Sequence, residues 1–257
     1  MHVVVCVKQI PDPAVPGELD PSTHALKREG KLILDESDSY GVEMALQLVD
    51  KAGGGEVTLI SMAPNAEVSG LRTALAMGAA KAILVSDDAL AGADALSTAK
   101  VLAKCVERAG EVDLVLTATE STDGYTGTIP AQVAELLGWP SLTFAKEIHL
   151  EGTTAKIQRQ TEAGYDVVEA SLPAVVSVTA GVVEPRYPSF KGIMAAKSKP
   201  VDQVSTGDLG LAADAIAPNQ TITSVTAAPA REAGEKIEDD GTAFEKVVEF
   251  LDGLKVI

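Results

Sequence analysis

The sequence is poor in cysteine, histidine and aromatic residues, and each shortage excludes a class of protein. Its 257 residues include 2 cysteines, Cys6 and Cys105, which are too few for a disulfide framework and lie in apolar runs typical of buried thiols. The 3 histidines are scattered, and there is no Ser-His-Asp order, metal-ligand spacing or glycine-rich dinucleotide motif. We therefore expect neither a metal site nor a catalytic site built by this chain alone.

Positive charge and long apolar runs are also scarce. The chain has 21 Lys and Arg residues against 37 Asp and Glu, whereas a nucleic-acid-binding protein normally presents a basic face. No apolar run approaches the ~20 residues of a membrane-spanning helix, and the run at residues 2–7 is shorter than the apolar region of a secretory signal. We expect a soluble, cytoplasmic protein that binds no nucleic acid and does not insert into a membrane.

Strand and helix patterns alternate over the first 140 residues. Continuous β-branched runs are typical of strands buried on both faces of a parallel sheet, and apolar residues at helical spacing, closed by glycines, follow them. This order predicts one doubly wound, mostly parallel α/β sheet of the adenine-nucleotide-binding (Rossmann-like) type with right-handed crossovers. The expected strands are residues 2–7, 57–61, 82–86 and 112–118, and the expected helices are residues 40–52, 65–77, 95–109 and 128–137.

The connections of the first half are predicted from their polar residues. Residues 8–30 are rich in Pro, Asp and Gly and are expected to form a loop, with a short edge strand at 31–34. Ser37, Asp38 and Ser39 are candidate N-caps of the first helix.

The character of the chain changes after residue 141. Residues 143–150, 155–162 and 165–171 are expected to add antiparallel strands, residues 172–179 one more buried strand, and residues 189–197 a short helix. We predict an α/β domain over residues 1–211, an extended linker over 212–236 and a C-terminal helical arm over 237–257. The arm has an apolar stripe and cannot be stable alone, so it must dock on its own domain or on a partner; the stripe consists of Phe244, Val247, Val248 and Leu251.

The loop from Glu120 to Thr128 is the strongest candidate for ligand binding. It follows the fourth predicted strand and leads into a helix, which is where open α/β sheets bind ligands. Its two glycines let backbone N–H groups approach an anion, and the helix N-terminus favours negative charge. The alternative is an ordinary strand–helix turn, but location and composition together favour a nucleotide phosphate. Hydroxyl donors are supplied by Ser121, Thr122, Thr126 and Thr128.

Two neighbouring features support this interpretation less strongly. The turn from Asp35 to Asp38 contacts a ribose or base on one interpretation, but simple helix capping is the commoner use of such residues. Lys8 directly follows the first strand and either neutralises a phosphate or is an ordinary surface lysine. No lysine completes a P-loop motif in the candidate loop, so the sequence does not suggest ATP hydrolysis.

Residues 183–200 combine aromatic, apolar and basic side chains in a chain that is only 4% aromatic. Such residues are enriched in protein interfaces, and the prolines and glycine between them disfavour a buried regular element. The alternative is core packing beneath a loop, and we favour an interface. The residues expected to contact a partner are Tyr187, Phe190, Ile193 and Met194.

Four stretches of the sequence resemble the beta subunit of electron transfer flavoproteins. They are VVVCVKQIPDP at residues 3–13, LRTALAMGAAKAILV at 71–85, ESTDGYTGTIPAQVAELLGWP at 120–140 and LPAVVSVTAGVVEPRYPSFKGIMAAKSKP at 172–200. The resemblance covers about residues 1–211. It implies an electron carrier rather than an enzyme, paired with an alpha subunit that holds most of the FAD site, while the beta subunit buries a structural AMP.

The resemblance also implies partners and site residues. The pair would accept electrons from acyl-CoA and other flavin dehydrogenases of fatty acid beta-oxidation and pass them to a membrane quinone oxidoreductase. Residues 187–197 would be the recognition loop, with Phe190 at the place of its apolar anchor. By position, AMP would touch Cys6, Asp35, Glu36, Ser37, Asp38, Met62, Asp123, Gly124, Tyr125, Thr126, Gly127 and Thr128.

The sequence departs from the family pattern at two places. The family loop often has an Asp-Gly-Asp run where this chain has Asp123-Gly124-Tyr125, and an Asn-Pro pair often stands in place of Asp35-Glu36. Some relatives bind a second FAD in place of AMP and bifurcate electrons; that alternative stays open, although AMP is our expectation. The rival function is a stand-alone nucleotide-binding regulatory or hydrolase protein of similar fold, which would need no C-terminal arm.

Overall fold

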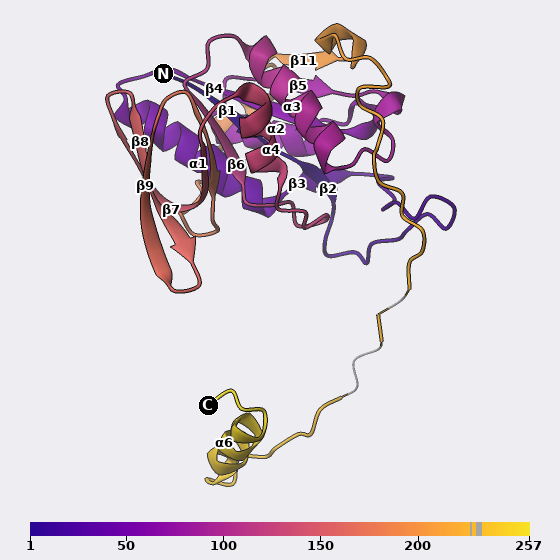
Figure 1. Ribbon diagram of the computed structural model, residues 1–257, viewed down its shortest axis with the longest axis vertical. Helices are drawn as coiled ribbons and strands as arrows, with labels where there is room; N and C mark the ends of the chain where they lie inside the picture. Colours follow the sequence, from indigo (N-terminus) through magenta and orange to yellow (C-terminus); the bar gives the residue numbers. More distant parts are fainter. Residues whose placement is uncertain (227, 230–232) are drawn as a thin grey trace. The chain divides into compact units, whose positions relative to one another are not determined.

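The central strands of the sheet are four apolar runs from the first half of the chain. A computed structural model describes residues 1–226, 228–229 and 233–257 (Figure 1). The chain divides into two units, Met1–Ile222 and Thr223–Ile257. In the first unit these runs lie parallel to one another and are almost wholly buried, as their β-branched composition predicts. They are β1 (His2–Cys6), β4 (Glu56–Met62), β5 (Lys81–Val85) and β6 (Leu114–Ala118).

Five further strands complete a nine-stranded sheet. Its order is β11-β5-β4-β1-β6-β10-β7-β8-β9, and every neighbouring pair from β11 to β7 is parallel. The last two pairs are antiparallel, so β7 is parallel to β10 on one side and antiparallel to β8 on the other. The added strands are β7 (Ser141–Glu151), β8 (Thr154–Thr161), β9 (Gly164–Ser171), β10 (Ala174–Val178) and β11 (Val201–Val204).

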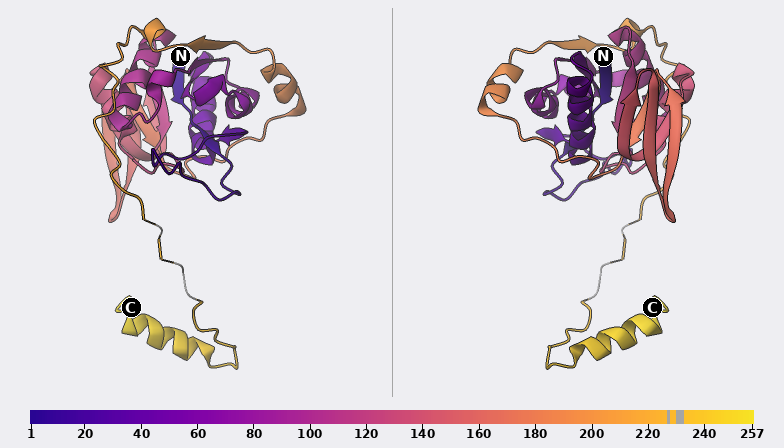
Figure 2. Two further views of the ribbon diagram at one scale, coloured as in Figure 1. Left: turned by 90° about the vertical axis from the view of Figure 1, so that its right-hand side faces the viewer. Right: turned by 90° about the vertical axis from the view of Figure 1, so that its left-hand side faces the viewer.

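Helices cover both faces of the sheet, which makes the fold doubly wound (Figure 2). Alternate residues of each strand point to opposite faces, so Val5 and Leu59 pack with α1 and α2, while Val4 and Ile60 pack with α3 and α4. The predicted α/β class is therefore confirmed. The helices are α1 (Glu36–Lys51), α2 (Ser69–Met77), α3 (Ala95–Ala109) and α4 (Ile129–Leu137), with short 3₁₀ turns η1 (Pro64–Ala66), η2 (Asp88–Leu90) and η3 (Gly207–Leu209).

Three local predictions were wrong, the first of them the start of the helix expected over residues 65–77, which begins only at Ser69 after the turn η1. The loop expected over residues 8–30 contains a short strand, β2 (Gln9–Pro11), which pairs with the predicted edge strand β3 (Leu32–Leu34) and places Ile10 opposite Ile33. The first helix also begins earlier than expected, because Asp35 is its N-cap and accepts a hydrogen bond from the Ser37 N–H at 3.1 Å. Both predicted buried thiols are confirmed, and burial raises the pKa of Cys105 to about 12.

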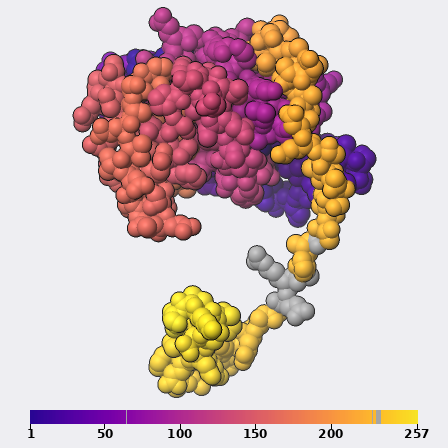
Figure 3. Space-filling model, viewed as in Figure 1, coloured from indigo at the N-terminus to yellow at the C-terminus, as the bar shows by residue number. Residues whose placement is uncertain are grey.

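The first part of the predicted linker packs on α3, as Figure 3 shows for the orange segment. The side chain of Ile216 is fully buried, and the Asn219 N–H donates to the α3 cap Asp94 at 2.6 Å. The Lys100 ammonium and the Ser97 hydroxyl, both on α3, donate to carbonyl oxygens of the same segment. The first unit thus extends to Ile222, beyond the boundary expected at residue 211, and residues 227 and 230–232 of the predicted linker lie outside the described part of the chain.

The second unit contains the helix α6 (Ala243–Gly253). Its apolar side chains are exposed within that unit, Phe244 and Phe250 most of all. Across the described residues, no helix combines the length and apolar character needed to span a membrane.

Candidate functional site

The strand order reverses between β1 and β6, and the candidate residues gather at that point. From β1 the chain runs outward through β4 to β5, then crosses back to place β6 on the other side of β1. In open α/β sheets the loops after two such strands diverge at the carboxyl ends of the strands, and ligands bind in the crevice between them. Here those loops begin with Lys8 after β1 and with Glu120 after β6.

Asp123 lies at the centre of this edge and accepts hydrogen bonds from two cations. The Lys8 ammonium lies 2.6 Å from one carboxylate oxygen, and the Arg28 guanidinium lies 2.5 Å from the other. The same ammonium donates to the Ser121 hydroxyl at 3.2 Å. The Asp123 side chain is only 7% exposed; although burial raises its pKa, the hydrogen bond and charge of Lys8 and the charge of Arg28 hold that pKa below the ordinary value. One carboxylate thus orders two cations beside the candidate loop.

The backbone of the candidate loop is held in an uncommon conformation. Tyr125 has φ of 48° and Gly127 has φ of 69°, and the left-handed region is rare for a side chain as large as tyrosine. The Tyr125 N–H donates to the Ser121 carbonyl oxygen at 2.9 Å, which closes a tight turn. Residues 126–128 are exposed and lead directly into the N-terminus of α4. Their hydroxyls, the free end of the helix and the two nearby cations form a surface suited to a phosphate.

Asp35 ties the start of α1 to this loop. Its buried carboxylate accepts from the Ser37 hydroxyl at 2.7 Å and from the Thr122 N–H at 2.7 Å. The capping interpretation of Asp35 is therefore correct, and the same side chain also positions the candidate loop. The Ser37 hydroxyl oxygen also lies 3.3 Å from the Glu120 carbonyl oxygen, at the start of the candidate loop.

The other predicted nucleotide contacts lie around the same edge. Asp38 is buried, accepts from the Lys8 N–H at 2.6 Å, and has a pKa raised well above its usual value by burial. Cys6 is buried at the end of β1, Met62 is half-buried at the end of β4, and Glu36 is exposed. The structure thus brings the predicted set together at the carboxyl ends of β1, β4 and β6, and its contact with a nucleotide stays a prediction.

Arg28 is the cation that sequence reasoning missed. It lies in the loop of residues 8–30, and only its charge and its position shortly before β3 could have singled it out. Its partner Asp123 is 95 residues away along the chain, so no local pattern signals the pair.

The predicted docking residues form a separate cluster on the segment that precedes and includes α5 (Phe190–Ala196). Tyr187 is 92% exposed and Phe190 is 80% exposed, while Ile193 and Met194 are about half exposed. Core packing does not account for them, because a core aromatic ring would be covered. The base of the segment is fixed by Arg186, whose guanidinium lies 2.6 Å from the buried carboxylate of Glu43 on α1.

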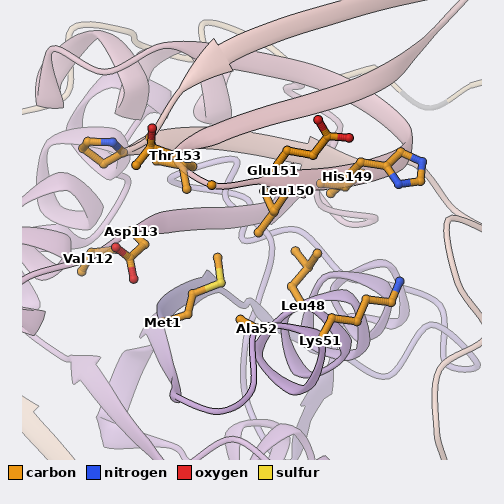
Figure 4. A pocket seen from close by; sticks show the side chains of 14 residues that line it. Met1, Leu48, Lys51, Ala52, Val112, Asp113, His149, Leu150, Glu151 and Thr153 are labelled. Carbon is orange, nitrogen blue, oxygen red and sulfur yellow. The ribbon is translucent and has the colours of Figure 1, made fainter.

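A cavity of about 570 Å³ lies at the opposite edge of the sheet (Figure 4). It lies where the parallel strands begin, between the end of α1 and the turn that joins β7 to β8, and Met1, Leu48 and Leu150 point toward one another across it. None of the predicted site residues lines it. Ligands of such sheets bind at the carboxyl ends of the strands, so this cavity is not the candidate nucleotide site.

Comparison with known proteins now adds to this geometry. Residues 23–209 match the model of the electron transfer flavoprotein domain. The electron transfer flavoprotein subunit beta of Mycobacterium tuberculosis (strain ATCC 25618 / H37Rv) is 38% identical over 264 residues, which cover 100% of this chain and 99% of that protein. This chain belongs to the electron transfer flavoprotein beta-subunit family.

Other members of the electron transfer flavoprotein family match over nearly the whole chain. The subunit beta of Mycobacterium leprae (strain TN) is 39% identical over 100% of this chain and 99% of its own length. The caffeyl-CoA reductase-Etf complex subunit CarD of Acetobacterium woodii is 37% identical over 96% of this chain and 95% of its own length. The family resemblance is thereby confirmed, and with it the role of an electron transfer flavoprotein beta subunit.

Proposed function

We propose that this chain is the beta half of a heterodimer that carries electrons from acyl-CoA and other flavin dehydrogenases to a membrane quinone oxidoreductase in the cytoplasm. The alpha subunit holds most of the FAD, and this chain holds AMP. The observation that carries the AMP assignment is the convergence of Lys8 and Arg28 beside the loop at the strand-order switch. FAD supplies the redox chemistry when bound, whereas this chain supplies shape, charge and docking.

The residues at the edge fit an adenine nucleotide. Thr126 and Thr128 offer hydroxyl donors on an exposed turn in which Tyr125 and Gly127 have positive φ. Lys8 and Arg28 both pair with the carboxylate of Asp123. A phosphate would give the two cations a second anionic partner.

The first experiment measures the bound nucleotide. The heterodimer is purified, precipitated with acid, and its supernatant is separated by chromatography. We expect one FAD and one AMP per heterodimer. Two FAD and no AMP would show the bifurcating alternative, and the absence of any nucleotide beyond one FAD would refute the phosphate loop.

An arginine variant tests which residues hold the phosphate. Arg28→Met should lower AMP retention by about tenfold or more, because a charge-assisted hydrogen bond contributes ~1.5–3 kcal/mol. Lys27→Met is the matched control, since Lys27 is the adjacent residue and pairs with Glu18 on the same loop. Equal AMP content in the two variants would show that Arg28 does not contact the nucleotide.

The stand-alone alternative predicts a different behaviour in solution. A self-sufficient nucleotide-binding protein would purify as a monomer or homodimer and would leave the apolar side of α6 without a function. Co-purification of a second, yellow subunit at one-to-one stoichiometry supports the heterodimer. Full recovery of a colourless single-subunit protein from its native source would support the alternative.

A further inference from the structure

The docking segment contacts α2, and Figure 2 shows it beyond that helix, away from the sheet. A Cβ atom at Gly192 would lie 2.4 Å from the Ala76 carbonyl oxygen, a distance that no side chain can occupy. Ala196, the last residue of α5, is only 2% exposed. The two helices therefore meet through a glycine and an alanine, and α5 approaches α2 at backbone distance.

Two cations secure this contact from opposite sides. The Arg72 guanidinium on α2 donates to the carbonyl oxygens of Ala196 at 2.6 Å and Lys199 at 2.7 Å, at the end of α5. The Lys199 ammonium donates to the carbonyl oxygens of Leu75 at 2.8 Å and Ala79 at 2.7 Å, at the end of α2. Each cation thus joins a carbonyl oxygen in the last turn of one helix, Ala196 of α5 or Leu75 of α2, to one just beyond that helix, Lys199 or Ala79.

The arrangement suits the helix dipoles as well as the hydrogen bonds. The C-terminus of a helix carries partial negative charge, so a cation placed there is stabilised. Lys199 is half-buried, and this burial lowers the pKa of its ammonium. Neither Arg72 nor Lys199 forms an ion pair with a carboxylate among the described residues.

The length of α5 makes this clamp necessary. A seven-residue helix has no independent stability in water, so its order depends on tertiary contacts. Ser189 caps its start, Arg186 ties the preceding residues to Glu43, and Arg72 with Lys199 hold its end. With both ends held, Phe190, Ile193 and Met194 remain exposed in one arrangement.

We propose that Arg72 and Lys199 are positioning residues that order the docking helix before a partner binds. The conformational entropy of α5 is lost when the chain folds, so a partner dehydrogenase binds a helix that is already ordered and its binding does not include this entropy loss. This inference rests on the docking role proposed for Phe190. It adds that affinity for the partner depends on residues that the partner does not touch.

The test compares variants of the purified heterodimer. Electron acceptance from a purified acyl-CoA dehydrogenase of the same organism is measured as a function of heterodimer concentration. Arg72→Met should raise KM by about tenfold, because coupled ordering of a segment weakens binding by at least this factor, and should leave kcat within about twofold. Arg72→Lys keeps a donor for the two carbonyl oxygens and should recover most of the loss. Arg159→Met is the matched control, since its guanidinium also donates to a carbonyl oxygen, that of Thr143 at 3.1 Å, but joins β8 to β7 at the other end of the sheet.

Hydrogen exchange provides a second readout that does not depend on the partner. In the heterodimer, amides of residues 190–197 should exchange at least tenfold faster in Arg72→Met and in Lys199→Met than in the wild type. Unchanged exchange in both variants overturns the proposal, even if a variant has lowered stability or FAD content. This readout also covers a variant too unstable for kinetics.

Phe190→Ala separates this inference from the function on which it rests. If Phe190→Ala raises KM and Arg72→Met does not, α5 is the docking site but Arg72 does not position it. If neither variant changes KM while α5 exchange accelerates in Arg72→Met, the docking assignment itself is wrong. If both raise KM and Arg72→Lys restores it, the positioning role is supported.

Discussion

Three aspartates at the carboxyl edge of the sheet show how much the surroundings decide a residue's role. Asp35 is buried and accepts from backbone and hydroxyl donors, Asp123 is held between two cations, and Asp38 is buried with a single backbone donor. Hydrogen bonds and cations stabilise a carboxylate, whereas burial alone stabilises the neutral acid. Lys8 and Arg28 accordingly hold the pKa of Asp123 low, and burial holds the pKa of Asp38 high.

The raised pKa of Asp38 predicts a pH dependence of stability. Its folded-state pKa lies above the unfolded value of about 4. The contribution of the Asp38 carboxyl to the free energy of unfolding is therefore fully present below that pH and is lost as the pH rises through the folded-state pKa. Asp38→Asn keeps an acceptor for the Lys8 N–H without the charge. The Tm of Asp38→Asn minus that of wild type should therefore increase from pH 4 to pH 8. Each kcal/mol of difference in the free energy of unfolding corresponds to roughly 2–4 °C.

A second aspartate variant checks the sign of this prediction. The pKa of Asp123 is lowered, so its contribution is present at neutral pH and is lost as the pH falls. Asp123→Asn should therefore have its largest Tm deficit at neutral pH, and the deficit should shrink in acid. Thermal melting of each heterodimer from pH 4 to pH 8 gives the slope for Asp38→Asn, and melting from about pH 2 to pH 5 gives the slope for Asp123→Asn. A flat difference curve for Asp38→Asn would contradict the burial argument.

At the scale of elements, one feature repeats in the loops that follow β1, β6 and β10. Each is joined to a distant part of the chain. Lys8 joins the loop after β1 to Asp123 in the loop after β6, and Thr122 joins the latter loop to Asp35 at the start of α1. Arg186 joins the segment after β10 to Glu43 on α1. Although burial raises the pKa of Glu43, hydrogen bonds from Arg186 and Gln47 hold it below its usual value, so the carboxylate stays charged. Ordered loops on a rigid sheet are where α/β proteins place binding residues.

Phe190 provides the prediction for the docking segment. It is exposed on α5, and an anchor that inserts into a partner's pocket contributes ~2 kcal/mol or more, roughly thirtyfold in affinity. In Phe190→Ala, electron acceptance from a partner dehydrogenase should fall by about tenfold or more on that estimate. FAD content, AMP content, Tm and reduction by dithionite should stay near wild type.

Tyr165→Ala is the matched control for Phe190→Ala. Tyr165 is an aromatic residue about half exposed on β9, at the opposite end of the chain's sheet from β11. It should leave electron acceptance unchanged. Loss of Tm and FAD in Phe190→Ala would instead show that Phe190 stabilises the fold and that docking lies elsewhere.

At the scale of the whole molecule, the chain divides into a sheet unit and a helical unit of very different character. The first has two buried cores, one on each face of the sheet. The second has a helix that the rest of its own unit does not bury. Its exposed apolar side chains, among them Phe244, Val247 and Val248, need a protein surface to cover them. We propose that this surface belongs to the alpha subunit.

Deletion of residues 235–257 tests the role of this unit. Because both cores are built from residues of the first unit, the truncated chain should keep its circular dichroism spectrum apart from the helical contribution of α6. Its co-elution with the alpha subunit in size-exclusion chromatography should be lost or weakened by about tenfold or more, since several apolar side chains would lose their cover. Val248→Asp should weaken assembly, and Glu249→Gln is its adjacent control. Assembly that survives the deletion would place α6 on its own sheet unit.

The amino-acid sequence alone determined the alternation of strands and helices, the sheet class, the family, and the loop at the end of β6. These follow from local periodicity, turn residues and contiguous family motifs, and a single stretch of chain carries each of them. Tertiary structure decided which distant groups meet: Arg28 with Asp123 across 95 residues, Arg72 with Ala196 across 124, and Ile216 with the core beside α3. Periodicity reports which side of an element is buried, but the partner of a lone cation or of an isolated isoleucine depends on how whole elements pack, and no local pattern records that.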